Sequence, residues 1–239
     1  MMSKIKSLVF YVVLSFFSAY AVSAQKINQF DENKKRTGIW KKFYKNKRIR
    51  YVGKFKNGKE VGTFKYYDIR TSKFPVIIKE FKPETDSAYV KFYTIKEKLR
   101  SKGWMVLRNR VGKWVYYFPN GKLFSEELYK NGKLEGIVKN YYRSGKLLEK
   151  THYKNGKKNG SSKQYSDEGI LIEEVYYKED VLDGEAKYFE LNGKLRERGV
   201  YKEGKRYGKW EFFINGEIVD EKKQQELKKF SPDKSKKRN

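Results

Sequence analysis

Glycine returns at a fixed interval along most of this chain, and this period constrains the fold more than any other feature. The glycines that open the repeating units are Gly38, Gly62, Gly112, Gly136, Gly160, Gly184 and Gly208. Their residue numbers increase in steps of 24, except for one step of 50 between Gly62 and Gly112. A unit without a glycine, beginning at Ala88, divides that step into 26 and 24. Eight consecutive units follow, the last of them truncated, which is the signature of a repeat architecture.

An aromatic residue stands five positions after the start of all eight units. These residues are Phe43, Tyr67, Tyr93, Tyr117, Tyr141, Tyr165, Phe189 and Phe213. Aromatic residues make up only 17% of the chain, so eight rings at one position are not accidental. We interpret these rings and the opening glycines as structural repeat positions, with each glycine at the start or the end of a strand.

Each unit has the pattern of a β-hairpin. In the unit that begins at Gly112, apolar runs are separated by Pro119-Asn120-Gly121 and then by Asn131-Gly132. Asn-Gly between alternating apolar runs is the strongest local hairpin signal. An isolated hairpin is marginally stable, so neighbouring units must stack on one another. The sequence predicts an all-β fold, an elongated single-sheet antiparallel β-meander of about eight 24-residue hairpin repeats.

Three tryptophans stand two positions after an opening glycine, and three before the aromatic position: Trp40, Trp114 and Trp210. In a flat strand an odd separation places two side chains on opposite faces. Either a β-bulge intervenes, or both faces of the sheet carry aromatic rings. Rings that recur four positions after the unit start favour the second interpretation.

The stretch from Met1 to Ala24 has the three parts of a signal peptide. Lys4 and Lys6 are followed by an apolar run and by the small residues Val22-Ser23-Ala24. A membrane anchor is the alternative, but the run is shorter than the roughly 18–20 residues that a spanning helix needs. We therefore expect cleavage near Ala24, export to the periplasm, envelope or exterior, and no membrane span in the mature chain.

The domain organisation follows from the leader and the repeats. Residues 1–24 are the predicted signal peptide and residues 25–37 a lead-in. Residues 38–219 form the repeat domain, with units starting at 38, 62, 88, 112, 136, 160, 184 and 208. Residues 220–239 form a basic C-terminal tail.

The formal net charge is +27, and it falls to +25 without the leader, which carries two lysines and no acidic residue. Such a charge attracts anionic surfaces and polymers, although a lysine-rich composition also serves solubility. The absence of cysteine excludes disulfides, thiol chemistry and lipoprotein-type lipidation. An exported chain without cysteine points to a bacterial envelope.

The sequence offers no catalytic constellation, and we predict no enzyme activity, no cofactor and no metal. His152 is the only histidine, at a unit position that holds Leu128, Tyr176 and Val200 elsewhere, so we interpret it as a repeat side chain. The pairs Glu126-Glu127 and Glu173-Glu174 fall at matching unit positions, which indicates strand surface more than an acid/base pair.

The stretch from Asp68 to Arg110 is the least regular part of the repeat domain. It carries a two-residue insertion, Pro75 and Pro83, and it lacks the turn glycines of its neighbours. One interpretation is a bend or a binding bulge. Ordinary divergence of the repeat is the alternative, and we favour it.

The pattern Tyr-x-Asn-Gly-Lys-x-x-Gly-x-Trp-x-x-Tyr-Tyr-x-x-Gly-x-Leu runs from Tyr129 onward and is fullest around Gly112. It resembles the MORN repeat (membrane occupation and recognition nexus), and more closely the bacterial MORN-variant repeat of proteins labelled antitoxin-like. The resemblance covers Thr37 to Ile218. It implies an elongated β-meander that binds proteins or membrane lipids or acts as a scaffold. The antitoxin label implies a cytoplasmic role, which the leader contradicts.

Binding is therefore the expected function, through exposed rings and lysines on a rigid ribbon. The candidate partner-binding residues are Trp40, Trp114, Trp210, Lys113 and Lys209. The first hypothesis is a protein-interaction or scaffold module of the bacterial envelope, with an unknown protein partner. The alternative is binding to anionic lipid head groups or lipopolysaccharide. A toxin-neutralising, immunity-like protein ranks third, and export argues against a nucleic-acid partner.

Overall fold

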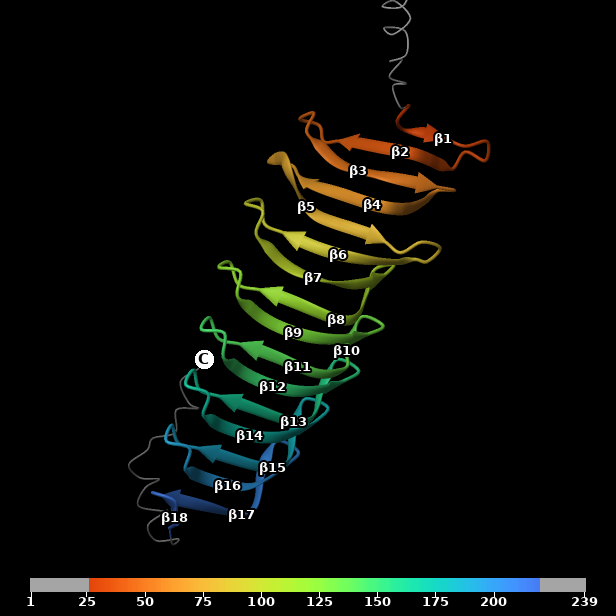
Figure 1. Ribbon diagram of the computed structural model, residues 1–239. Helices are drawn as coiled ribbons and strands as arrows, with labels where there is room; N and C mark the ends of the chain where they lie inside the picture. The colour runs from red at the N-terminus through yellow and green to blue at the C-terminus, as the bar shows by residue number, and fades with distance from the viewer. Residues whose placement is uncertain (1–25, 220–239) are drawn as a thin grey trace, which may run out of the picture.

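The computed structural model describes residues 26–219, which form one open antiparallel sheet without helices (Figure 1). The predicted leader and tail lie outside the described residues. The strands are β1 (Gln29–Phe30), β2 (Arg36–Phe43), β3 (Ile49–Lys56), β4 (Lys59–Asp68), β5 (Thr71–Phe81), β6 (Ser87–Tyr93), β7 (Leu99–Val106), β8 (Asn109–Tyr117), β9 (Leu123–Lys130), β10 (Lys133–Leu134), β11 (Gly136–Tyr141), β12 (Leu147–Lys154), β13 (Lys157–Tyr165), β14 (Leu171–Lys178), β15 (Val181–Phe189), β16 (Leu195–Lys202), β17 (Lys205–Ile214) and β18 (Glu217–Ile218).

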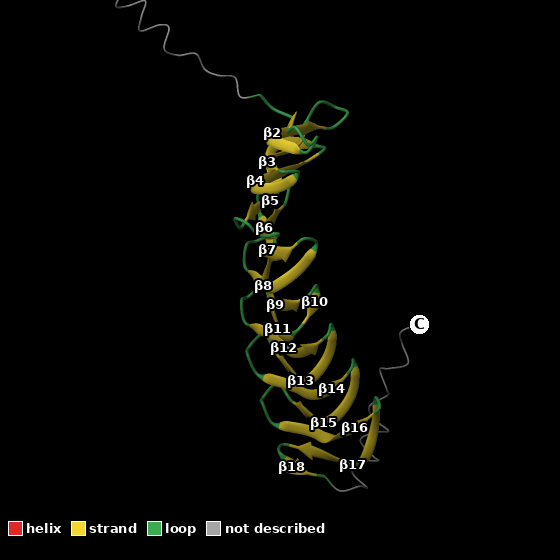
Figure 2. Ribbon diagram, turned by 90° about the vertical axis from the view of Figure 1, so that its right-hand side faces the viewer, coloured by secondary structure: helices red, strands yellow, loops and turns green. Residues whose placement is uncertain are grey.

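The long strands pair in chain order, from β2 to β9 and from β11 to β17, and β9 pairs with β11. The two-residue strands β1, β10 and β18 pair with β2, β9 and β17. Seen from the side, the strands are curved and follow one another along a narrow ribbon (Figure 2). The predicted all-β meander is confirmed.

The between-unit turns have the predicted left-handed conformation. Asn131 and Gly132 have φ angles of 51° and 80°, as a two-residue hairpin turn of the primed type requires. Glu179 and Asp180 adopt φ angles of 50° and 73°, so they form the same turn without glycine.

Most of the opening glycines lie inside strands, and not at the strand ends where the sequence predicts them. Gly112 has a φ of 64° within β8, where the pairing with β7 skips from Trp114 opposite Gly103 to Val111 opposite Trp104. A bulge at this point needs positive φ, which glycine supplies without steric strain. The glycine therefore bends the strand.

The core lies on one face of the sheet, and its centre is the residue two positions after each unit start. These residues have between 0% and 9% of their surface exposed. They are Trp40, Phe64, Val90, Trp114, Val138, Ser162, Ala186 and Trp210. Together with their cross-strand neighbours they form one line along the ribbon, which we call the core row.

Ring size in the core row is matched by the residue on the preceding strand. Gly103 lies opposite Trp114, and a Cβ at Gly103 would collide with the Trp114 ring. Gly53 on the strand before Phe64, and Gly199 on the strand before Trp210, occupy the same unit position, and a Cβ there would also collide with the ring. Where the residue on the preceding strand is larger than glycine, the core-row residue opposite it is small. Thr151 pairs with Ser162, and Val175 with Ala186.

Cationic side chains cover the aromatic parts of this core. The guanidinium of Arg206 lies 3.9 Å from the centre of the Trp210 ring, and that of Arg110 lies 4.9 Å from the Trp114 ring. Arg36 lies 5.0 Å from the Trp40 ring. Such contacts contribute about 0.5–2 kcal/mol each, and the alkyl stems shield the rings from water. A single-layer sheet thus acquires a covered core.

Of the two solutions to the odd spacing of the aromatic positions, the structure shows rings on both faces of the sheet. A register shift separates the fourth and fifth positions of the units, as between Tyr116 and Tyr117. Tyr116 packs against Trp114 on the core face, whereas the Tyr117 ring lies 5.7 Å from Lys102 Nζ on the other face. Rings therefore occur on both faces.

Candidate binding surface

The face opposite the core carries a continuous line of charged residues. Side chains alternate across a strand, so each neighbour of a core-row residue points away from the core. Fifteen of these neighbours pair directly with one another from β2 to β17. In order they are Lys41, Val52, Lys65, Ile78, Lys91, Lys102, Val115, Glu126, Lys139, Lys150, Lys163, Glu174, Lys187, Arg198 and Glu211. We call this line the lysine ladder and its side of the sheet the lysine face.

The ladder is more basic than composition explains. Nine of its 15 members are Lys or Arg, against 56 of 239 residues in the whole chain. Like charges lie directly opposite each other at Lys91 and Lys102 and along Lys139, Lys150 and Lys163. Directly opposed like charges destabilise a sheet. The fold does not need this arrangement, which makes the ladder a candidate for function.

Carboxylates neutralise only part of the ladder. Lys163 Nζ lies 2.9 Å from Glu174, and Arg198 Nε lies 2.5 Å from Glu211. Lys139 and Lys150 have no ion pair within the described chain. Exposed pairs of this kind contribute at most about 1 kcal/mol and leave the charge accessible. The ladder keeps a surplus of positive charge near its middle.

Glu126 is the most strongly engaged acid of the ladder. It forms an ion pair with Lys113 and accepts a 2.9 Å hydrogen bond from the Tyr141 hydroxyl. The Lys113 contact, followed by the Tyr141 bond, lowers the pKa of Glu126. Burial and the same carboxylate raise the pKa of Tyr141 to about 12. Glu126 therefore stays ionised and Tyr141 protonated at neutral pH.

Two aromatic or apolar rows flank the ladder. On one side lie rings from the fifth unit position, where Lys41 Nζ is 5.8 Å from the Phe43 ring and Arg198 is 5.6 Å from the Phe213 ring. On the other side an apolar row consists of half-exposed side chains, each 40% to 43% accessible. Its members are Trp104, Leu128, Tyr176 and Val200. The lysine face thus combines charge with flat apolar contact area.

The structure separates the predicted partner-binding residues into two groups. Trp114 is fully buried, and Trp40 and Trp210 are 9% and 8% exposed, so the expected exposure of these rings is wrong. They belong to the core row because the bulge at the opening glycine folds them over the preceding strand. Lys113 and Lys209 are exposed and stand next to core-row residues, on the lysine face.

Within residues 26–219 no contact joins His152 to either glutamate pair. Glu126 and Glu127 point to opposite faces, since Glu127 pairs with the buried Trp114. His152 Nδ1 lies 3.0 Å from the Ser161 carbonyl oxygen, as a cross-strand contact. Within residues 26–219 no three His, Cys, Asp or Glu side chains form a group that could hold a metal, and no helix is long and apolar enough to cross a membrane.

Sequence reasoning missed the ladder and Trp104. Lysine recurs three positions after the unit start, at Lys41, Lys65, Lys91, Lys139, Lys163 and Lys187, and this period was a usable signal. The other ladder residues stand fourteen positions after the unit start. Only the strand register makes them neighbours of these lysines. Trp104 lies outside the tryptophan position of the repeat, so the period could not find it.

A one-layer ribbon with a repeated core and a continuous charged face defines a linear repeat protein. Five segments of the chain match the family model described as the MORN repeat variant: residues 36–57, 110–131, 134–155, 158–179 and 182–203. The chain is therefore a MORN-repeat protein. MORN repeats are non-catalytic modules that in general bind proteins or membranes. A search of the curated proteins finds no match.

Proposed function

We propose that this chain is a non-enzymatic, exported module that attaches to anionic head groups of membrane lipids or lipopolysaccharide through its lysine face. The observation that carries the proposal is the lysine ladder, in which nine cations lie in one line across 15 paired strands. Strands are spaced about 4.8 Å apart, so the ladder presents charge at a spacing that a row of phosphate or carboxylate groups can meet. The predicted leader supports an envelope location.

Flotation with liposomes tests this function, with a chain that begins at Gln25 so that the apolar leader cannot itself bind. Replacing Lys139 and Lys150 by Glu should weaken binding to phosphatidylglycerol vesicles. Each lysine near an anionic membrane is worth about 1 kcal/mol, so we expect a loss of roughly thirtyfold or more. Raising the salt concentration should weaken binding by the wild-type chain, because exposed charges are screened.

A matched control has the same change in charge at the edge of the ribbon. Lys122 and Lys146 are exposed turn residues, and their replacement by Glu should reduce binding much less than the ladder variant. Equal losses in the two variants would show that net charge, and not the ladder, drives binding. Absence of flotation at low salt would exclude the proposal.

Protein binding is the second candidate, and the apolar row favours it. Leu128 and Tyr176 are exposed, and they lie beside the ladder on the same face. Aromatic and aliphatic contacts of this kind persist in salt, unlike contacts between exposed charges. A partner retained from envelope extracts at moderate salt, and lost after Leu128→Ser with Tyr176→Ser, would support this function over lipid binding.

A further inference from the structure

Trp104 differs from the other three tryptophans of the chain. Those three lie in the core row, whereas the Trp104 side chain is 40% exposed on the lysine face. Trp104 pairs across the sheet with Tyr89 of β6. Within the described residues, neither the Trp104 indole N–H nor the Tyr89 hydroxyl makes a hydrogen bond. The two rings therefore offer unused donors to a ligand.

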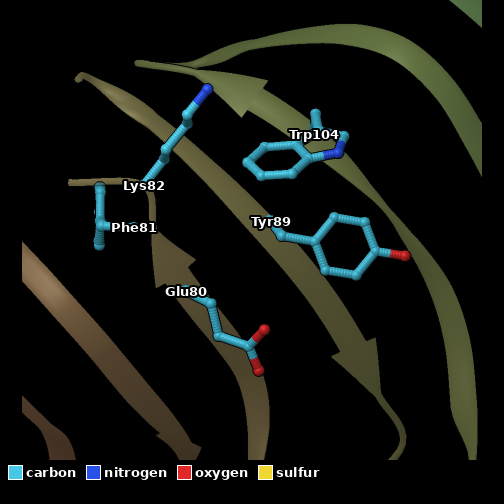
Figure 3. A pocket seen from close by; sticks show the side chains of 5 residues that line it. All are labelled: Glu80, Phe81, Lys82, Tyr89 and Trp104. Atoms are coloured by element: carbon cyan, nitrogen blue, oxygen red, sulfur yellow. The ribbon is translucent and has the colours of Figure 1, made fainter. Parts of the chain in front are cut away.

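The Tyr89 and Trp104 rings form two walls of a shallow pocket. Their centres are 5.4 Å apart, and their planes meet at 62°. The pocket has a volume of about 430 Å³ and is lined by Glu80, Phe81, Lys82, Tyr89 and Trp104. Figure 3 shows Lys82 beside the Trp104 ring and Glu80 beside the Tyr89 ring, both on the same side of the two rings. Phe81 packs its own ring into the core against Phe64, which leaves four side chains for a ligand.

The charge around the pocket selects the sign of the ligand. Lys91 Nζ lies 5.7 Å from the centre of the Tyr89 ring and 3.1 Å from Glu80, so it neutralises the only nearby acid of the lining. Lys102, the ladder partner of Lys91, stands two residues before Trp104 on the same face. Lys82 is exposed and has no ion pair within the described chain. Three lysines against one glutamate disfavour a cation over the two rings and favour an anion.

The shape of the pocket selects a ligand with a flat, hydroxylated body. An aromatic face carries negative charge, so it attracts the partly positive C–H groups on the face of a sugar ring. The indole N–H and the phenol can donate to sugar hydroxyls, and Glu80 can accept from them. A few polar groups around apolar walls are typical of ligand pockets of about 300–1,000 Å³.

We propose that this pocket binds an acidic sugar residue, such as a uronic acid, within an anionic polysaccharide that the lysine ladder holds. The proposal rests on the function proposed above, and it names a glycan as the source of the negative charge, in place of a phospholipid. It also gives the irregular stretch from Asp68 to Arg110 a role, since Glu80, Tyr89 and Trp104 all belong to it.

A binding test of the full chain with three polymers distinguishes the contribution of charge from that of the sugar. Polygalacturonate carries both, polyphosphate carries charge alone, and dextran carries sugar alone. We expect the wild-type chain to bind the first two and not dextran. Trp104→Ala should weaken polygalacturonate binding by roughly tenfold, the typical worth of one aromatic stacking contact, and should leave polyphosphate binding unchanged.

Tyr176→Ala is the matched control, because Tyr176 occupies the same unit position with the same 40% exposure. It should leave the affinity for both polyanions unchanged. Trp104→Phe, which keeps an aromatic face, should recover part of the loss. Lys82→Gln changes an exposed side chain without affecting the core, and it should weaken polygalacturonate binding several-fold.

The outcomes distinguish this proposal from the proposed function. If Trp104→Ala and Lys82→Gln bind polygalacturonate as tightly as the wild type, or lose affinity for both polyanions equally, the pocket is not a sugar site. If the wild-type chain binds neither polyanion, the lysine face is not an anion-binding surface at all. Melting temperatures of all variants identify any loss that is due to unfolding.

Discussion

Glu173 is the acid that the fold accommodates least well. It lies on the core face of β14, between Gln164 and Tyr188 on the adjacent strands. Burial raises the pKa of its carboxyl group; Lys158 opposes this increase and Glu149 adds to it. The carboxyl has no ion pair within the described chain. A charged Glu173 therefore destabilises the folded state at neutral pH.

Glu173→Gln should raise the melting temperature at pH 7. Because the folded-state pKa is raised, the carboxyl favours folding fully below its ordinary value of 4.5, and this contribution is lost as the pH rises through the raised pKa. The advantage of the variant should therefore disappear when the pH falls below about 4.5. Thermal unfolding followed by circular dichroism at both pH values measures it.

Glu174→Gln is the control for this experiment. Glu174 lies on the lysine face and pairs with Lys163 at 2.9 Å, so its removal should lower stability at pH 7 by less than about 1 kcal/mol. A gain of stability in both variants would mean that the total charge, and not the burial of Glu173, is responsible.

At the scale of the strand, the repeat tolerates variation because residues change in matched pairs. Gly103 leaves room for the Trp114 ring, which also donates its indole N–H to the Trp104 carbonyl at 2.9 Å. Thr151 and Ser162 occupy the same two positions and are 2.7 Å apart, hydroxyl to hydroxyl. A residue at one of these two positions therefore cannot be replaced by its counterpart from another unit unless its cross-strand partner is replaced too.

Gly103→Thr should destabilise the wild-type chain by about 2–3 kcal/mol, because the new side chain overlaps the Trp114 ring. Trp114→Ser alone should cost about 3–5 kcal/mol, since it leaves a cavity. In the Trp114→Ser background, Gly103→Thr should be neutral or stabilising. Urea unfolding of the four chains measures this reversal of sign; additive effects would contradict the pairing.

The hairpins were predictable from the sequence, but the faces of their residues were not. Period and Asn-Gly turns are local, and they located the strands around Asn131-Gly132 correctly. Which face Trp114 and Tyr117 occupy follows from the strand register, which the repeat period does not give. A glycine inside a strand reads like a turn glycine, because both positions require positive φ. The glycine pattern therefore does not determine which face the tryptophans occupy.

At the scale of the whole molecule, stability and binding both extend along one dimension. Each strand pairs with the strands next to it, and core side chains such as Phe92 of β6 and Trp114 of β8 also meet across one strand, so the energetics are local along the ribbon. The ladder was not predictable, because it joins residues of different unit positions, such as Lys139 and Lys150, that only the register makes neighbours. The family resemblance predicted a binding module, but it did not indicate which face binds.

Two deletions, each the length of one repeat, should have opposite outcomes. Removal of residues 171–194 keeps Gly199 next to Trp210, whereas removal of residues 184–207 places Val175 before Trp210, where a Cβ collides with the ring. We expect the first chain to remain folded and the second to be destabilised by about 3 kcal/mol more. Urea unfolding and small-angle scattering check both, and equal stability of the two chains would contradict the expectation.

The first strand determines how long this surface can become. Asn28 donates its backbone N–H to the Ile39 carbonyl at 2.8 Å, and its side-chain oxygen accepts from the Lys41 N–H at 2.8 Å. With β1 also paired to β2, the outer edge of β2 has no room for another strand. Pairing of a second molecule with the edge of β2 is thereby hindered. The length of the lysine face is therefore set by the number of repeats in the sequence.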